Sequence, residues 1–308
     1  MDWRRCQWGE EAGNPLIEPI GRSWMIADPT VLLPEESPDG RWHLFANSIP
    51  PRLHEFVSED GVDWRHARSF ARGAMRPFVR RFADRYHLFY EVVDWWLPLR
   101  SRIVHSVSED LIHWSQPREV LRPSFAWHGR VNRNVGNPCV VAWREEYLLF
   151  YSAGTVFLRD CGFVEPRYVG LARSRSLHGP WSADRDPILG PRPEDPLRNL
   201  GAGSIKVHSE PATGTLWGFN NGIYRDGEGR SRSALALLSS ADGVVWEGLE
   251  EGPFLAPGGS GWKRALVYAV DVRRTAHNQL HLYFNARDGW FRGKERIGLA
   301  IGRVPGDQ

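Results

Sequence analysis

The protein has 308 residues, of which 42% are hydrophobic and 25% are charged, a composition typical of a soluble globular protein. Its formal net charge of +2 at pH 7 gives no argument for binding nucleic acid or an anionic membrane. The three cysteines lack metal-type spacing, and no segment resembles a signal peptide or a membrane span, so we expect a cytoplasmic location.

A short pattern recurs along the chain and divides it into units. Each unit begins with an apolar segment, continues with a strand rich in aromatic residues, and ends in a Ser-x-Asp-x-x-x-Trp turn or a related sequence. The apolar segments are "ADPTVLL" (27–33), "MRPFVRR" (75–81), "GNPCVVAW" (136–143), "GAGSIKV" (201–207) and "YAVDVRR" (268–274). The aromatic strands are "WHLFA" (42–46), "YHLFY" (86–90), "YLLFY" (147–151), "LWGF" (216–219) and "LHLYF" (280–284). The turns are "SEDGVDW" (58–64), "SEDLIHW" (108–114), the looser "SRSLHGPW" (174–181) and "SADGVVW" (240–246).

Five such units predict one all-β domain over residues 1–308, a five-bladed β-propeller with four-stranded antiparallel blades around a central funnel. The expected blades span residues 22–66, 74–118, 132–185, 200–248 and 263–304. The fifth unit lacks a clear outer strand, so we expect the N-terminal segment, near residues 15–25, to complete it. Two β-sandwich domains are the alternative, but they give no reason for a fivefold repeat.

The "ADP" opening of the first unit, the "SLHGPW" phrase and the repeated turn resemble the five-bladed glycosidases of glycoside hydrolase family 43 and its relatives in families 32, 62, 68 and 117. The resemblance spans residues 22–304. It implies a funnel in which a first-blade Asp acts as general base, a third-blade Asp orients the site and a fourth-blade Glu is the general acid. Such a set suits inverting hydrolysis, which needs one protonated and one ionised carboxyl group.

This sequence departs from that set at two of the three positions. Asp28 matches the base, but Asn137 stands where the third-blade Asp is expected. The fourth-blade segment Gly201–Gly203 offers no acid at all. The resemblance therefore predicts the fold of a propeller glycosidase in which two of the three catalytic carboxylates are missing.

Other acids in the units are candidates for the missing chemistry. Glu91 follows the second aromatic strand, at the mouth of the funnel, and is our candidate for a displaced acid; the alternative is an ion pair with Arg76 or Arg100. Asp271 lies near the start of the fifth inner strand, where alternation could point it into the channel. Its alternative is a structural carboxylate paired with an arginine.

The loops expected over the funnel carry further candidates. Asp94, Trp95 and Trp127 are expected substrate contacts, because indole rings stack on the apolar faces of sugars. His128 is a candidate acid or base, since the unperturbed pKa of histidine is near neutral. Arg133, in the polar stretch "WHGRVNRNVGN" (127–137), is an expected ligand contact.

Four residues on the inner strands and their ends complete the expected substrate-binding set. Arg76 occupies the second-unit position equivalent to Asp28, and Asn137 the third-unit position. Tyr268 opens the fifth inner strand. Arg287, in "NARDGW", resembles a fifth-blade arginine that contacts substrate in family 43, and with Arg133 it suggests a carboxylate, a phosphate or a dense array of hydroxyls in the ligand.

These observations predict an enzyme of the family 43 type that acts on a small glycoside, a sugar-like molecule or a specialised metabolite by non-standard acid/base chemistry. A non-catalytic carbohydrate- or ligand-binding propeller and a cyclase- or lyase-like enzyme on the same frame are the alternatives. The expected partner is a small molecule, without nucleic acid or membrane. No cofactor is expected. A cation bound in the funnel is an open alternative, for which the sequence identifies no ligands.

Overall fold

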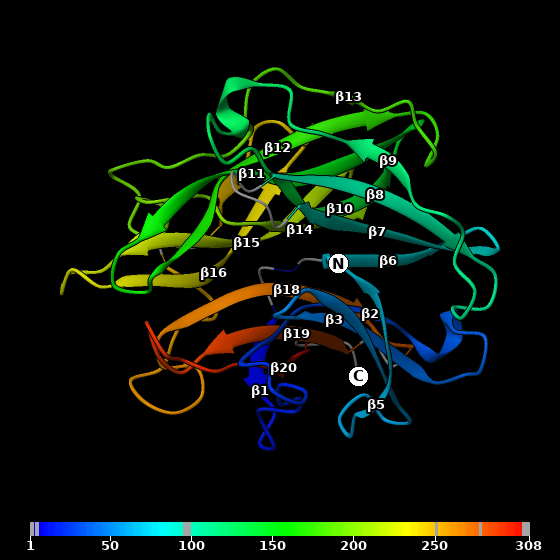
Figure 1. Ribbon diagram of the computed structural model, residues 1–308, viewed down its shortest axis with the longest axis horizontal. Helices are drawn as coiled ribbons and strands as arrows, with labels where there is room; N and C mark the ends of the chain where they lie inside the picture. The colour runs from blue at the N-terminus through cyan, green and yellow to red at the C-terminus, as the bar shows by residue number, and fades with distance from the viewer. Residues whose placement is uncertain (1–2, 4–5, 95–99, 250–251, 277–278, 304–308) are drawn as a thin grey trace.

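The computed structural model describes residues 3, 6–94, 100–249, 252–276 and 279–303, which form five four-stranded antiparallel sheets arranged as a propeller (Figure 1). The five-bladed architecture expected from the repeats is confirmed. Two short 3-10 helices, η2 (Pro34–Glu36) and η3 (Ala126–His128), lie in connections. None of the described helices is long and apolar enough to cross a membrane.

The blades follow one another along the chain. The first comprises β2 (Ile26–Leu32), β3 (Trp42–Ser48), β4 (Arg52–Ser58) and β5 (Arg65–Arg72). The second comprises β6 (Ala74–Phe82), β7 (Arg85–Asp94), β8 (Arg100–Ser108) and β9 (Arg118–Leu121). The third comprises β10 (Val135–Trp143), β11 (Glu146–Leu158), β12 (Phe163–Ser174) and β13 (Ser182–Ala183). The fourth comprises β14 (Ile205–Glu210), β15 (Thr215–Arg225), β16 (Ser231–Ser240) and β17 (Glu247–Gly248).

The fifth blade joins the two ends of the chain. It comprises β18 (Leu266–Arg274), β19 (Leu280–Arg287), β20 (Glu295–Arg303) and β1 (Gln7–Glu10). The closing strand is therefore β1, and the expectation that residues 15–25 form it is wrong. That segment instead makes two isolated bridges to the same β20, Ile17 with Ile297 and Met25 with Glu295. The radial arrangement leaves outer edge strands, some of which are short: β13 and β17 have two residues each.

The repeated Ser-x-Asp turn has a local physical cause. In the first blade Asp60 Oδ1 accepts hydrogen bonds from the backbone N–H groups of Val62 and Asp63, at 2.8 and 2.9 Å. The Trp64 indole then donates to the carbonyl of Gly61, at 3.1 Å. The same bonds recur in the fourth blade around Asp242. The side chain thus replaces a backbone turn and fixes where the tryptophan points.

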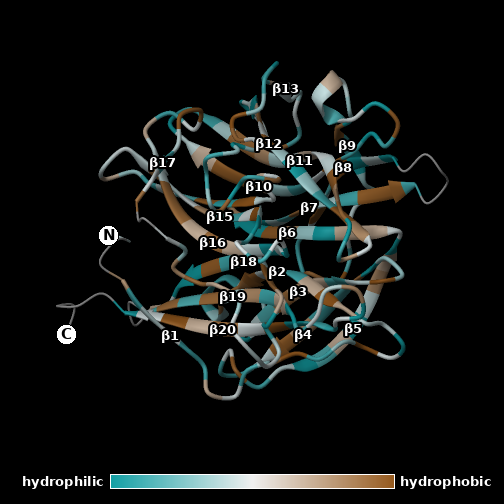
Figure 2. Cartoon of the chain, turned by 90° about the vertical axis from the view of Figure 1, so that its left-hand side faces the viewer, coloured by the Kyte–Doolittle hydropathy of each residue, from teal (hydrophilic) through white to brown (hydrophobic). Residues whose placement is uncertain are grey.

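These tryptophans fill the joints between blades. Trp64 packs edge-on against Tyr283 of the fifth blade, with ring centroids 5.6 Å apart. Trp246 packs in the same way against Phe150 of the third blade, at 5.8 Å. Hydrophobic residues lie mainly on the strands, while many connecting loops are hydrophilic (Figure 2). The packed joints make the propeller a rigid support for residues at its axis.

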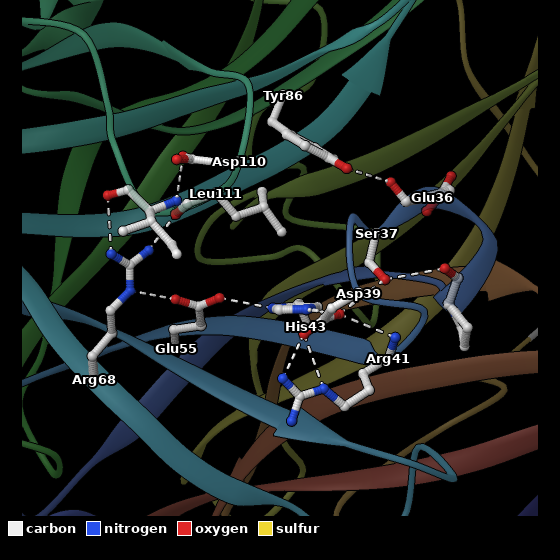
Figure 3. A network of polar contacts seen from close by, with 12 residues as sticks. Glu36, Ser37, Asp39, Arg41, His43, Glu55, Arg68, Tyr86, Asp110 and Leu111 are labelled. Atoms are coloured by element: carbon white, nitrogen blue, oxygen red, sulfur yellow. Dashed lines mark hydrogen bonds and ion pairs between the residues drawn. The ribbon is translucent and has the colours of Figure 1, made fainter.

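A polar network closes the joint between the first two blades (Figure 3). Arg68 donates to Glu55 at 2.5 Å and to the carbonyl of Leu111 in the second blade. His43 bridges Glu55 and Asp39, at 2.7 and 2.9 Å. Burial alone would lower the pKa of His43, but the two carboxylates outweigh it and raise that pKa above its ordinary value. The network spans the joint with paired charges.

Candidate functional site

In four of the five blades, a bulge near the start of the inner strand interrupts its pairing. The pairing of β2 with β3 slips between Ala27 and Thr30, and equivalent slips occur in β6, β10 and β18. The residues at the first three bulges have left-handed backbones, which non-glycine residues seldom adopt. They are Asp28 (φ 56°), Arg76 (φ 52°) and Asn137 (φ 49°). Gly203 (φ 60°) has the same conformation at the start of the fourth inner strand.

Side chains of neighbouring blades hold these bulges. The Asn285 side chain accepts a bond from the Asp28 backbone N–H at 3.1 Å, and Asn47 accepts one from Arg76 N–H at 2.5 Å. Ser152 donates to the carbonyl of Gly203 at 2.8 Å. Each bond joins one blade to the first strand of the next. Hydrogen bonds from their backbone N–H groups, as well as packing, therefore fix the positions of Asp28 and Arg76.

The residues at the first three bulges line a cavity of about 350 Å³ at one end of the axis. This volume suits a small ligand. Apolar side chains, among them Met25, Ile49 and Phe163, make up much of its wall. Its ionisable lining residues are Asp28, Arg76, Glu91, Arg100, Glu165, Tyr268, Arg287 and Glu295.

The pKa of Asp28 is subject to opposing effects. Burial raises the pKa of its carboxyl group above the ordinary value, and the charges of Arg76 and Lys206 partly oppose this effect. Lys206 shares with Asp28 a second, narrow cavity close to the axis. A carboxylate held between two cations can remain ionised at neutral pH and still accept a proton.

Glu91 is paired with the arginine that faces it. Its Oε2 lies 2.6 Å from Arg76 Nη1, and the Glu91 residue is buried. A Cβ atom on Gly136 of the next blade would lie 1.9 Å from the same oxygen, so a larger residue there would displace the Glu91 carboxylate. The structure thus places Glu91 and Arg76 together at the cavity wall, in the ion pair that was the alternative to a displaced acid.

A carboxyl group absent from the sequence-based candidates also lines the cavity. Glu165 lies on the long β11–β12 hairpin of the third blade, opposite Val156. Burial raises the pKa of Glu165 to about 7, and the negative charge of Asp28 acts in the same direction while Arg76 opposes it. A group with this pKa can hold a proton at neutral pH and release it during a reaction.

The hairpin brings Glu165 to the start of the fourth blade. The backbone N–H groups of Ala202 and Gly203 donate to the carbonyls of Arg167 and Pro166, at 3.0 and 3.2 Å. A Cβ atom on Gly201 would lie 2.8 Å from the carbonyl oxygen of Pro166. The small residues of the segment where the family acid was expected therefore allow a hairpin carrying a different glutamate to pack against it.

The fifth blade contributes Tyr268, Arg287 and Glu295. Glu295 Oε1 accepts a bond from Asn285 Nδ2 at 2.5 Å, and its other oxygen lies 3.8 Å from Arg287 Nη1. Burial raises the pKa of Glu295 to about 8, although Arg287 opposes this shift. Burial also raises the pKa of Tyr268 well above its ordinary value, an effect increased by Glu165 and Glu295. Tyr268 is therefore a protonated hydroxyl, able to donate a hydrogen bond.

Asp271 does not belong to the described lining of this cavity, contrary to expectation. It is 0% exposed and accepts bonds from Arg80 Nη1 and Nη2, at 2.9 and 2.5 Å, and from Val31 N–H at 2.7 Å. Burial would raise the pKa of Asp271, but Arg80 outweighs it and holds that pKa far below the ordinary range. The structure supports a structural carboxylate between the first, second and fifth blades.

We expect Asp271→Asn to lower the free energy of unfolding by about 3 kcal/mol, because removing one partner of a buried pair leaves the other charge uncompensated. The amide can still accept one bond, which places the loss at the low end of the range for such pairs. Urea unfolding at pH 7 measures it. Glu109→Gln, which removes an exposed pair with Arg85, is the matched control and should change stability by less than about 1 kcal/mol. Equal losses for both variants would contradict this assignment.

His128 and two of its neighbours also lie outside the described cavity lining. His128 is buried, with Nδ1 accepting from Ser124 N–H at 3.0 Å and Nε2 3.2 Å from the Tyr151 hydroxyl. Burial lowers the pKa of His128 to about 4, which favours the neutral ring. Trp127 donates to a backbone carbonyl at 2.8 Å, and Arg133 donates to another at 3.0 Å. These residues stabilise the loop over β11 instead of facing the cavity.

The last two candidates, Asp94 and Trp95, are not among the described residues that line the cavity. Asp94 is exposed and lies 3.2 Å from Arg102 in an ion pair, away from the described lining. Trp95 lies outside the described residues. Of the twelve candidate residues, the structure brings six to the cavity: Asp28, Arg76, Glu91, Asn137, Tyr268 and Arg287.

No group of three or more His, Cys, Asp or Glu residues within the described part of the chain is placed to hold a metal ion. The polar side chains that line the cavity carry carboxyl, guanidinium, amide and hydroxyl groups, and one phenol. Three buried carboxyl groups with raised pKa values, Asp28, Glu165 and Glu295, line the same cavity. Acids whose pKa values are shifted by burial within one cavity are typical of acid–base sites.

Comparison with known proteins finds likeness in structure only. No family model matches the sequence. No curated protein matches it either. Among solved structures, an N-acetylgalactosamine deacetylase from F. plautii, in complex with blood group B trisaccharide, is 15% identical with a TM-score of 0.64, covering 98% of this chain and 96% of its own.

Two other solved structures are glycosidases. An α-L-arabinofuranosidase from Fusarium graminearum, in complex with an iminosugar inhibitor, is 12% identical with a TM-score of 0.64, over 94% of this chain and 97% of its own. A family 117 glycoside hydrolase from Zobellia galactanivorans is 12% identical with a TM-score of 0.61, over 98% and 92%. This chain therefore has the five-bladed fold expected from its resemblance to the propeller glycosidases. One fold serves different reactions, so the reaction must be argued from the site.

Proposed function

We propose that the protein is a glycoside-processing enzyme in which Asp28 is the general base and Glu165 the general acid. The observation that carries this proposal is the place of Glu165, on a hairpin packed against Gly201–Gly203, where the resemblance implied an acid and the sequence has none. Asp28 occupies the base position of the same frame. The missing acid is thus supplied by another strand.

The reaction follows from these two groups. Asp28 takes a proton from a water molecule as the water oxygen forms a bond to the anomeric carbon. The bond from that carbon to the leaving oxygen breaks, and Glu165 gives its proton to that oxygen. Partial desolvation of both groups suits this exchange, because it keeps Glu165 protonated near neutral pH.

Three further residues would tune the site without transferring a proton: Arg76, Glu91 and Asn137. The Arg76–Glu91 pair places a guanidinium group beside Asp28, where it favours the ionised form. Asn137 offers a donor and an acceptor in place of a carboxylate. A non-catalytic propeller would bind a ligand at the same cavity wall but would transfer no proton. Measuring turnover therefore distinguishes an enzyme from a binding protein.

A panel of glycosides tests the proposal. The general acid lies on the β11–β12 hairpin and not at the position of the family acid. We therefore expect little activity on common aryl arabinosides and xylosides. Wild-type protein should release reducing sugar from another member of the panel, and Glu165→Gln should release it far more slowly. Glu146→Gln is the matched control, since Glu146 lies on the same hairpin outside the described cavity lining and pairs with Arg173. Ligand binding without any turnover would instead support the binding propeller.

A further inference from the structure

Two buried donors in the cavity wall lack a close hydrogen-bond partner. Arg287 is 3% exposed and Tyr268 6% exposed, and both line the cavity. Arg287 Nη1 makes no hydrogen bond to any residue that the structure describes, and the Tyr268 hydroxyl makes none of ordinary geometry, although it lies close enough to Glu165 to lower the pKa of that acid. Buried polar groups are nearly always bonded, so a pair of unbonded donors on one wall points to a ligand acceptor.

Arg287 is held rigidly in place. Its guanidinium carbon lies 4.6 Å from the ring centroid of Trp24 and 4.9 Å from that of Phe163. Its Nε donates to the carbonyl of Gly289 at 2.9 Å. These contacts fix the plane of the guanidinium group and leave Nη1 as a preorganised donor.

The charge of Arg287 is poorly compensated. Arg76 has a carboxylate at 2.6 Å, whereas the acid paired with Arg287, Glu295, lies 3.8 Å away. Burial raises the pKa of Glu295 to about 8, so this acid is largely neutral at pH 7. A buried cation without a close anion is costly unless a ligand supplies one.

We propose that this wall binds the carboxylate of an acidic sugar, with Arg287 and Tyr268 donating to its oxygens. The inference rests on the proposed function and specifies its substrate class as a uronic acid or its glycoside. A planar, singly charged carboxylate matches one guanidinium edge and one phenol hydroxyl. A phosphate group carries more charge and more acceptor oxygens than these two donors satisfy.

Binding measurements test this without requiring turnover. Isothermal titration calorimetry at pH 7 and low salt would compare galacturonate with galactose, glucuronate with glucose, and inorganic phosphate as a different anion. We expect at least one uronate to bind at least tenfold more tightly than its neutral counterpart. Arg287→Met should remove that preference, and Tyr268→Phe should reduce it several-fold.

The controls separate this proposal from the catalytic one. Arg102→Met removes an arginine that pairs with exposed Asp94 outside the described lining, and should leave the preference unchanged. Melting temperatures check folding, and Tyr268→Phe keeps the test decisive if Arg287→Met unfolds. Equal affinity for uronates and neutral sugars, no uronate binding, or a preference that survives both variants would overturn the proposal. Phosphate binding more tightly than either uronate would overturn the carboxylate assignment. A failure of Glu165→Gln to affect turnover would overturn the catalytic proposal alone.

Discussion

Asp28→Asn should lower kcat by about 10²–10⁴-fold, the usual contribution of a general base, while the protein remains folded. The amide has nearly the same shape as the carboxylate but cannot take a proton from water. The left-handed backbone at this position accepts asparagine, since Asn137 has φ 49° at the equivalent bulge of the third blade. The bond from the Asp28 backbone to Asn285 does not involve the replaced group.

Steady-state kinetics on a substrate from the glycoside panel, with melting temperature measured on the same samples, checks this prediction. Asp63→Asn is the matched control, because Asp63 is exposed in the same blade. A stable Asp28→Asn protein with wild-type kcat would remove Asp28 from the mechanism. A large fall in melting temperature with little change in kcat would make it a structural partner of Arg76.

Glu165→Gln should lower kcat by a similar factor of about 10²–10⁴, because glutamine cannot protonate the leaving oxygen. The loss should be smaller on substrates whose leaving groups depart without a proton, such as activated aryl glycosides. Comparing activated and unactivated leaving groups therefore measures the role of the acid. Equal losses on both kinds of substrate would contradict this role.

Glu91→Gln supplies the contrast. Glu91 lies 2.6 Å from Arg76 in a buried ion pair, so its removal should reduce stability and disturb the wall beside Asp28. The dependence on leaving group should stay as in the wild-type protein. If Glu91→Gln instead reproduces the behaviour expected of Glu165→Gln, Glu91 is the displaced acid.

The repeated pattern was sufficient to predict the fold, because the interactions that shape each unit form between residues close in sequence. The Asp60 and Asp242 turns form from bonds within a few residues, and the tryptophans that follow them pack between blades. Asp28, Arg76 and Asn137 could be aligned for the same reason, since each begins an inner strand at the same point of the repeat. The closing strand β1 was misplaced because Gln7–Glu10 has no counterpart in the other units.

The parts of the site that were missed depend on contacts distant in sequence. Glu165 reaches the cavity because β11 and β12 extend beyond the usual blade and pack against Gly201–Gly203. The unusual length of the third unit was the available signal. For Asp271 the structure favours the structural alternative: a bulge between Val267 and Val270 interrupts the pairing of β18, and the carboxylate bonds to Arg80 between blades.

The pH dependence of kcat/KM for wild-type protein and Glu165→Gln tests the central claim most directly, because this ratio reports ionisations of the free enzyme. In the wild-type protein the ratio should fall on the acid side as Asp28 gains a proton, above the ordinary carboxyl range because burial raises its pKa. It should fall on the alkaline side near pH 7 as Glu165 loses its proton. The account predicts that Glu165→Gln removes the alkaline fall and keeps the acid one. An alkaline fall that persists near pH 7 in Glu165→Gln would contradict it.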